Sequence, residues 1–67
     1  MKSLTLHQFL KEALLVPSPE LRPGQHFSNL LYLRRPDLSV DVSIAGLDPF
    51  YREDLIWPAI EFLKKIW

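Results

Sequence analysis

The residues best equipped for chemistry lie in the last third of the chain, where Asp48-Pro49-Phe50-Tyr51 is followed by Arg52-Glu53-Asp54. Grouped carboxylates can act as general acid and base. Glu53 and Asp54, however, stand beside a cation at the expected start of a helix, where carboxylates ordinarily cap free backbone N–H groups. We therefore expect a structural role for these acids and no paired-acid catalysis.

Asp48 precedes a proline, and this order of residues is typical of a helix start. Its carboxylate can accept the free backbone N–H of Phe50 or Tyr51, while Pro49 supplies the fixed φ of a first helical residue. The two aromatic rings can then pack the turn against the core. The sequence therefore predicts a structural cap, with Phe50 in the core, made of Asp48, Pro49, Phe50 and Tyr51.

Other residue types that carry chemistry are scattered. His7 and His26 are nineteen positions apart and fit no metal-ligand spacing. The chain has no cysteine, only two glycines and no Gly-x-Ser-x-Gly sequence, so it lacks a thiol nucleophile, a phosphate-binding loop and a serine elbow. We expect no enzyme activity, no cofactor and no metal site.

Length and composition narrow the class further. The 67 residues make one small domain (1–67), and 48% of them are apolar, too many for a disordered segment. A formal net charge of zero argues against nucleic acid as a partner, because an excess of Lys and Arg normally supplies that affinity. The apolar runs fall far short of the roughly 20 residues that cross a bilayer, and no signal pattern opens the chain. We therefore expect a cytoplasmic protein without a membrane segment.

Two helices are signalled by local patterns. Thr5 and Gln8 form a capping box, which predicts a helix over about 6–15. The apolar residues on its expected buried face are Leu6, Phe9, Leu10, Ala13 and Leu14. The prolines at 17 and 19 forbid its continuation. Arg22-Pro23-Gly24 leads into a second helix, which must stop near Arg34 because Arg35 precedes a proline.

The segment Leu38–Ile44 is ambiguous, because LSVDVSI alternates apolar and polar residues as a strand does. A single strand without a partner is not stable, which favours a short helix opening at Pro36-Asp37, with Leu38 and Val42 facing inward. The alternative is an α+β fold in which 38–44 pairs as a strand across a homodimer.

The last helix is expected from Asp54 or slightly earlier to the end of the chain, with Pro58 in its first turn or at a kink. Apolar residues cover most of its circumference, so it must be central or covered by something else. The sequence thus predicts an all-α fold, a compact bundle of three main helices plus one short helix or turn.

From Arg22 onward, the chain resembles a loose group of short, uncharacterised proteins of bacteria and their phages. The residues that carry the resemblance are Arg22, Gly24, Gln25, Phe27, Asn29 and Leu30, then Arg35-Pro36-Asp37-Leu38, Asp48-Pro49-Phe50-Tyr51 and Trp67. No activity belongs to this group. The resemblance implies a helical fold and a mobile-element context.

We therefore expect a non-enzymatic protein–protein interaction module, which in a mobile-element context would act by binding a host protein. A homo-oligomer would also bury the apolar surface of the last helix. Trp, Tyr and Arg dominate binding energy at interfaces, so the candidate partner-binding residues are Tyr32, Arg34, Arg35, Trp57 and Trp67. The alternative is a small helix-turn-helix transcriptional regulator built on Gly24–Arg34 and the helix that follows, although the latter lacks side chains that read bases.

Overall fold

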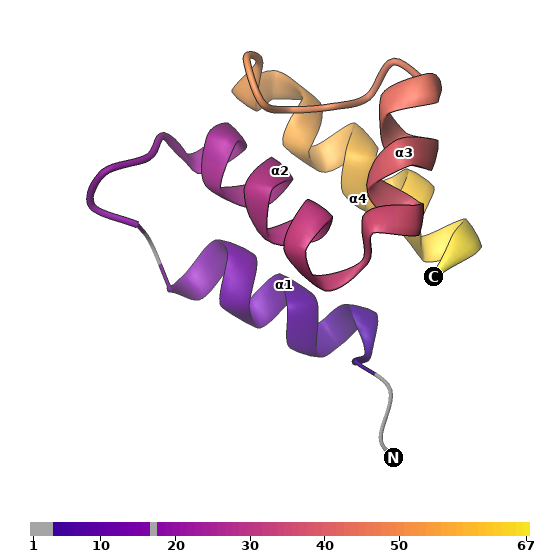
Figure 1. Cartoon of the computed structure of the whole chain (residues 1–67), viewed down its shortest axis with the longest axis horizontal. Helices are drawn as coiled ribbons and strands as arrows, with labels where there is room; N and C mark the ends of the chain where they lie inside the picture. Colours follow the sequence, from indigo (N-terminus) through magenta and orange to yellow (C-terminus); the bar gives the residue numbers. More distant parts are fainter. Residues whose placement is uncertain (1–3, 17) are drawn as a thin grey trace.

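The computed structural model describes residues 4–16 and 18–67, and it confirms the all-α prediction for them. Four α-helices and one 3₁₀ turn follow one another, with no strand among the described residues. Their bounds are α1 Leu6–Leu15, α2 Pro23–Arg34, α3 Pro36–Ile44, η1 Glu53–Leu55 and α4 Ile56–Ile66. Figure 1 shows α4 running behind α2 and α3, while α1 lies along the other side of α2.

Helix α1 begins and ends where the sequence predicts. The hydroxyl of Thr5 accepts the Gln8 N–H at 3.1 Å, and the Gln8 side chain accepts the Thr5 N–H at 2.9 Å, so both halves of the capping box are present. Its inner face buries Phe9 and Ala13.

Helix α2 starts with Pro23 and brings Gly24 against the segment that precedes α4. A Cβ on Gly24 would lie 2.2 Å from the carbonyl oxygen of Pro49, much closer than any side chain tolerates. Only glycine allows this approach of two backbones. The start of α2 is therefore packed directly on the 45–52 connection.

Helix α3 settles the ambiguity of the 38–44 segment, and the strand alternative is wrong. A strand would place Leu38, Val40, Val42 and Ile44 on one face. The helix instead buries Leu38 and Val42, four positions apart, and leaves Val40 and Ile44 exposed. Pro36 at the first helical position favours this outcome. At nine residues α3 is nearly as long as α1, so it is more than the turn that the sequence left open.

Helix α4 begins at Ile56, two residues later than expected, after the single 3₁₀ turn of η1. The cause is Pro58, which has no N–H to donate to the carbonyl of Asp54 and whose ring would clash with that carbonyl in a regular helix. Starting at Ile56 places Pro58 in the first turn, where no intrahelical bond is required of it.

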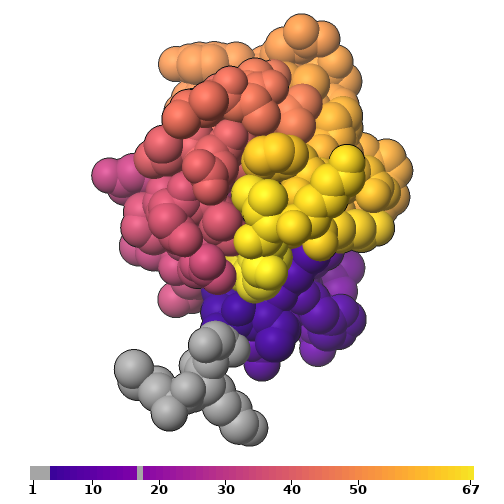
Figure 2. Space-filling view, turned by 90° about the vertical axis from the view of Figure 1, so that its right-hand side faces the viewer, coloured from indigo at the N-terminus to yellow at the C-terminus, as the bar shows by residue number. Residues whose placement is uncertain are grey.

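The core is formed by all four helices. Its fully or almost fully buried apolar residues are Phe9, Ala13, Phe27, Leu30, Leu31, Leu38, Val42, Ala59, Ile60 and Leu63. Figure 2 shows the end of α4 lying against α1 on one side and the region of α2 and α3 on the other. Within the described residues, none of the helices is long and apolar enough to span a bilayer.

Candidate functional site

The Asp48 segment forms a turn and not the predicted helix start. Asp48 Oδ1 accepts the Phe50 N–H at 3.0 Å, as the sequence indicates, and also accepts the Ser28 hydroxyl of α2 at 2.7 Å. The Arg52 N–H donates to the Pro49 carbonyl at 3.1 Å. Arg52 itself is extended (φ −140°, ψ 100°), so the turn does not propagate, and the helical residues begin only at η1.

The residue that fixes this turn to the core is Pro49, which is fully buried, whereas Phe50 is only half-buried. Phe50 packs edge-on against Tyr51, which is 81% exposed. The sequence assigned the core position to the larger ring. The structure gives it to Pro49, whose carbonyl oxygen lies so close to Gly24 that a Cβ at position 24 would clash with it.

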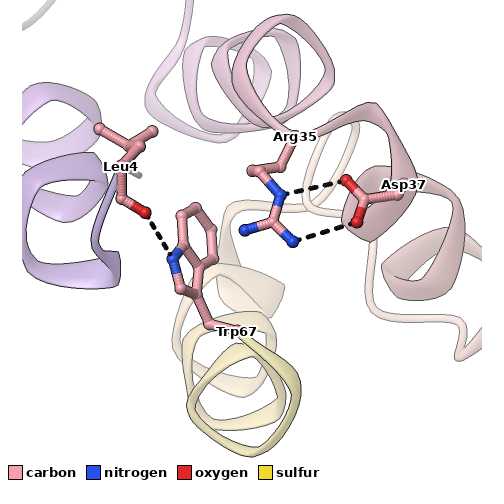
Figure 3. Close-up of polar contacts among 4 residues, drawn as sticks. All are labelled: Leu4, Arg35, Asp37 and Trp67. Carbon is pink, nitrogen blue, oxygen red and sulfur yellow. Dashed lines mark hydrogen bonds and ion pairs between the residues drawn. The ribbon is translucent and has the colours of Figure 1, made fainter. Parts of the chain in front are cut away.

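Arg35 and Trp67, two candidate partner-binding residues, have partners within the chain (Figure 3). The indole N–H of Trp67 donates to the Leu4 carbonyl at 3.0 Å, and its ring packs against Phe9 with centroids 5.2 Å apart. The guanidinium of Arg35 lies 5.1 Å from the Trp67 ring centroid and donates two hydrogen bonds to Asp37. These hydrogen bonds, together with the positive charge, hold the pKa of Asp37 below its ordinary value of 3.8.

The other three candidates are on the surface but are not gathered into one site by any described contact. Arg34 forms an ion pair with Glu12 of α1. Tyr32 and Trp57 are each 67% exposed, on α2 and α4 respectively. The rest of α4 exposes less apolar surface than the sequence implies, because Phe62 and Ile66 pack against the core.

The described residues present a different concave apolar surface on α1. One hollow of about 110 Å³ is lined by residues of α1, of α2 and of the connection between them: Ala13, Leu14, Ser18, Leu21, Pro23 and His26. A second, shallower hollow of about 190 Å³ runs along α1; its lining is His7, Leu10, Lys11, Leu14 and Leu15. Leu14 belongs to both hollows and forms the ridge between them. We call the two hollows together the α1 surface.

The apolar residues at the end of α1 are well exposed on this surface. Leu14 is 44% exposed, Leu15 72% and the adjoining Val16 60%. Scattered apolar residues on a surface are normal, whereas apolar residues that line adjoining hollows form a candidate interaction site. The helical periodicity of 6–15 predicts Leu14 on the buried face of its helix. The missed signal is the run Leu14-Leu15-Val16, because three consecutive residues of a helix end cannot all face one core.

The polar groups of the α1 surface are few. Lys11 is the one charged residue that lines it, and Lys11 forms no ion pair with the described residues. His26 contributes ring atoms to the smaller hollow, while its Nε2 is covered and makes no hydrogen bond with the described residues. Because Nε2 is not accessible, the hollow offers mainly shape and apolar contact.

The described residues contain a hydrogen-bonded pair of a serine and a carboxylate, and they contain no metal-binding cluster. Ser28 and Asp48 are hydrogen-bonded to each other, with the hydroxyl donating to the carboxylate at 2.7 Å, and the same carboxylate oxygen also accepts the Phe50 N–H. No group of three or more His, Asp or Glu side chains is placed to hold a metal ion among residues 4–16 and 18–67.

Comparison with protein-family models, with curated proteins and with solved structures finds no match to this chain. The function must therefore be argued from the geometry of the chain itself.

Proposed function

We propose that this chain is a non-enzymatic protein-binding module that docks a partner protein on the α1 surface. The observation that supports this most strongly is the pair of apolar hollows that share Leu14. Side chains that bind in well-packed, desolvated pockets contribute most of the energy of an interface. Because Leu14 and Leu15 already lie exposed, the surface needs no rearrangement before it binds.

The same geometry favours protein over DNA as the partner. In a helix-turn-helix, two helices are joined by a turn of about 3–4 residues and the second enters the major groove. Here Arg35 alone joins α2 to α3. Helix α3 exposes Asp37 and Asp41 and contains no Lys, Arg, Asn or Gln, so it would repel phosphates and has no amide or guanidinium to read bases.

The mobile-element context implied by the resemblance would make the partner a host protein. Affinity capture from a lysate of the source organism tests the proposal, with the wild-type chain, Leu15→Gln and Ile44→Gln as baits. Leu15 and Ile44 are similarly exposed, at 72% and 79%, but only Leu15 lines the α1 surface. We expect a protein that wild type and Ile44→Gln retain and that Leu15→Gln loses. Equal retention by all three baits, or no retained protein, would contradict the proposal.

The residues singled out from the sequence supply a second comparison. Tyr32→Ala and Trp57→Ala remove the two most exposed aromatic candidates on α2 and α4. If these variants lose the partner while Leu15→Gln keeps it, the binding surface is the one predicted from residue type and not the α1 surface.

A further inference from the structure

The α1 surface also constrains what kind of element can occupy it, and this inference rests on the proposed function. A dry cavity of about 150 Å³ can hold a benzene molecule. The hollow at the α1–α2 connection, at about 110 Å³, therefore suits one branched aliphatic side chain. The second hollow extends along α1 from His7 to Leu15, eight residue steps or about 12 Å at 1.5 Å per residue. It therefore suits a row of side chains and not a single one.

The backbone of the occupant is constrained by what the hollows lack. Apart from His7, Lys11, Ser18 and His26, the lining residues carry apolar side chains or are proline. A peptide that binds by strand addition would need a strand edge to pair its backbone N–H and C=O groups, and the described residues contain no strand. A helix satisfies its own backbone. Its apolar residues at i, i+3, i+4 and i+7 are spaced by 5–6 Å, so they can fall on either side of the Leu14 ridge.

The charge on the α1 surface indicates which polar residues the partner helix should carry beside its apolar stripe. Lys11 lines the surface without an ion-pair partner among the described residues, and His7 stands one helical turn before it. No acid lines either hollow. Glu12 points its carboxylate to Arg34, and Glu20 lies in the connection outside both linings. A partner with a carboxylate beside its apolar stripe would therefore complement this surface.

The same charges disfavour a second copy of the chain. In a two-fold dimer the surface would meet itself, and because no acid lines either hollow, the second copy would bring no carboxylate from this surface to Lys11. We propose that the occupant of the α1 surface is an acidic amphipathic helix, with apolar side chains in both hollows on either side of Leu14 and a carboxylate against Lys11.

A display library of helical peptides tests this proposal, with a fixed alanine-rich scaffold and randomised residues along one face and its flanks. Selection on the wild-type chain should enrich apolar residues at i, i+3 or i+4, and i+7, with Asp or Glu beside them. Selection on Lys11→Glu should lose the acidic preference or reverse it. Enrichment of basic or proline-containing peptides, or of none, would overturn the proposal.

The affinity of one enriched peptide, made synthetically, separates the contributions of the surface. Leu14→Gln should weaken it by about tenfold or more, which corresponds to the 1.4 kcal/mol expected from the loss of one good apolar contact. Ile44→Gln, on a different helix, should change it less than twofold. Circular dichroism of each variant verifies that the fold is intact. Equal affinities for Leu14→Gln and wild type would place the peptide elsewhere and overturn the proposal.

Two results distinguish a failure of this inference from a failure of the proposed function. If affinity capture yields a protein that Leu15→Gln loses, but the library yields no acidic helix, the function stands and the identity of its partner element is wrong. If sedimentation shows a dimer that Leu14→Gln dissociates, the occupant is a second copy and the inference is overturned.

Discussion

The guanidinium of Arg35 lies 5.1 Å from the centroid of the Trp67 ring, and this contact joins the α2–α3 connection to the end of α4. Arg35 is the only residue between α2 and α3, and Trp67 follows α4, so this contact ties three helices together. Trp67 also contacts α1 and the residue before its cap: its ring packs against Phe9, and its indole N–H donates to the carbonyl of Leu4. A cation over a Trp face contributes about 0.5–1 kcal/mol at exposed sites and more when water is excluded.

Truncation of Trp67 should therefore destabilise the whole fold. We expect Trp67→Ala to lower the free energy of unfolding by about 3 kcal/mol, the low end for such truncations because the ring is only half-buried. Trp67→Phe keeps an aromatic ring and loses the hydrogen bond to Leu4, so it should cost about 1 kcal/mol. Urea unfolding followed by circular dichroism measures both. A Trp67→Ala variant as stable as wild type would mean that Trp67 is free to bind partners.

Gly24→Ala should destabilise the chain although alanine is the better helix former. In an open helix the change would stabilise by about 1 kcal/mol. Here the new Cβ would meet the Pro49 carbonyl at 2.2 Å and the Glu53 side chain at 3.2 Å, and the carbonyl belongs to backbone that cannot rotate away. We expect a net cost of about 1–3 kcal/mol, as for an overpacked core. Asn29→Ala, at an exposed position of the same helix, is the control and should not destabilise.

The Ser28–Asp48 hydrogen bond should show measurable coupling. Asp48→Ala removes the acceptor of both Ser28 and the Phe50 N–H, so we expect a cost of about 1–2 kcal/mol, and Ser28→Ala should cost about 1 kcal/mol. The double variant should be more stable than the sum of the two losses predicts, because both single variants remove the same bond. Strict additivity would show that the hydrogen bond between Ser28 and Asp48 contributes nothing to the stability of the turn.

Stability should fall in acid through Asp37 and Asp54. Hydrogen bonds from Arg35 and Arg52 respectively, reinforced by their charge, hold the pKa of each carboxyl below its ordinary value of 3.8. A group with a lowered folded-state pKa contributes stability that is present above the unfolded-state value and lost as pH falls through the folded-state value. The unfolding midpoint should therefore decline below about pH 4.

The variants Asp37→Asn and Asp54→Asn should reduce the decline of the unfolding midpoint below about pH 4. Arg52→Gln should reduce it to the same extent as Asp54→Asn, because it removes the other half of that ion pair. Both pairs are exposed, so the change in midpoint will be small. Thermal melts across the acid range measure it. If the midpoint falls as steeply in acid for the double Asp variant as for wild type, protonation of Asp37 and Asp54 is not the cause of the decline.

The sequence by itself determined where most of the helices lie. Thr5 and Gln8 mark the start of α1, Pro23 that of α2 and Pro36 that of α3, and the structure has each helix at that place. These signals act within one helical turn, through caps and missing N–H groups, so no distant residue is needed to interpret them. The start of α4 was less well predicted, because the effect of Pro58 reaches back four residues and the preceding turn could be α or 3₁₀.

The tertiary structure alone decided which apolar and aromatic residues are covered. Its residue type made Trp67 a candidate for partner binding, yet its indole N–H donates a hydrogen bond to the carbonyl of Leu4, sixty-three positions away. Leu14 fitted the buried face of its helix, yet it remains exposed as the ridge between two hollows. Helical periodicity predicts which residues share one face of a helix, but it does not predict what packs against that face. Burial depends on which other helices pack there, and those contacts join residues far apart in the chain.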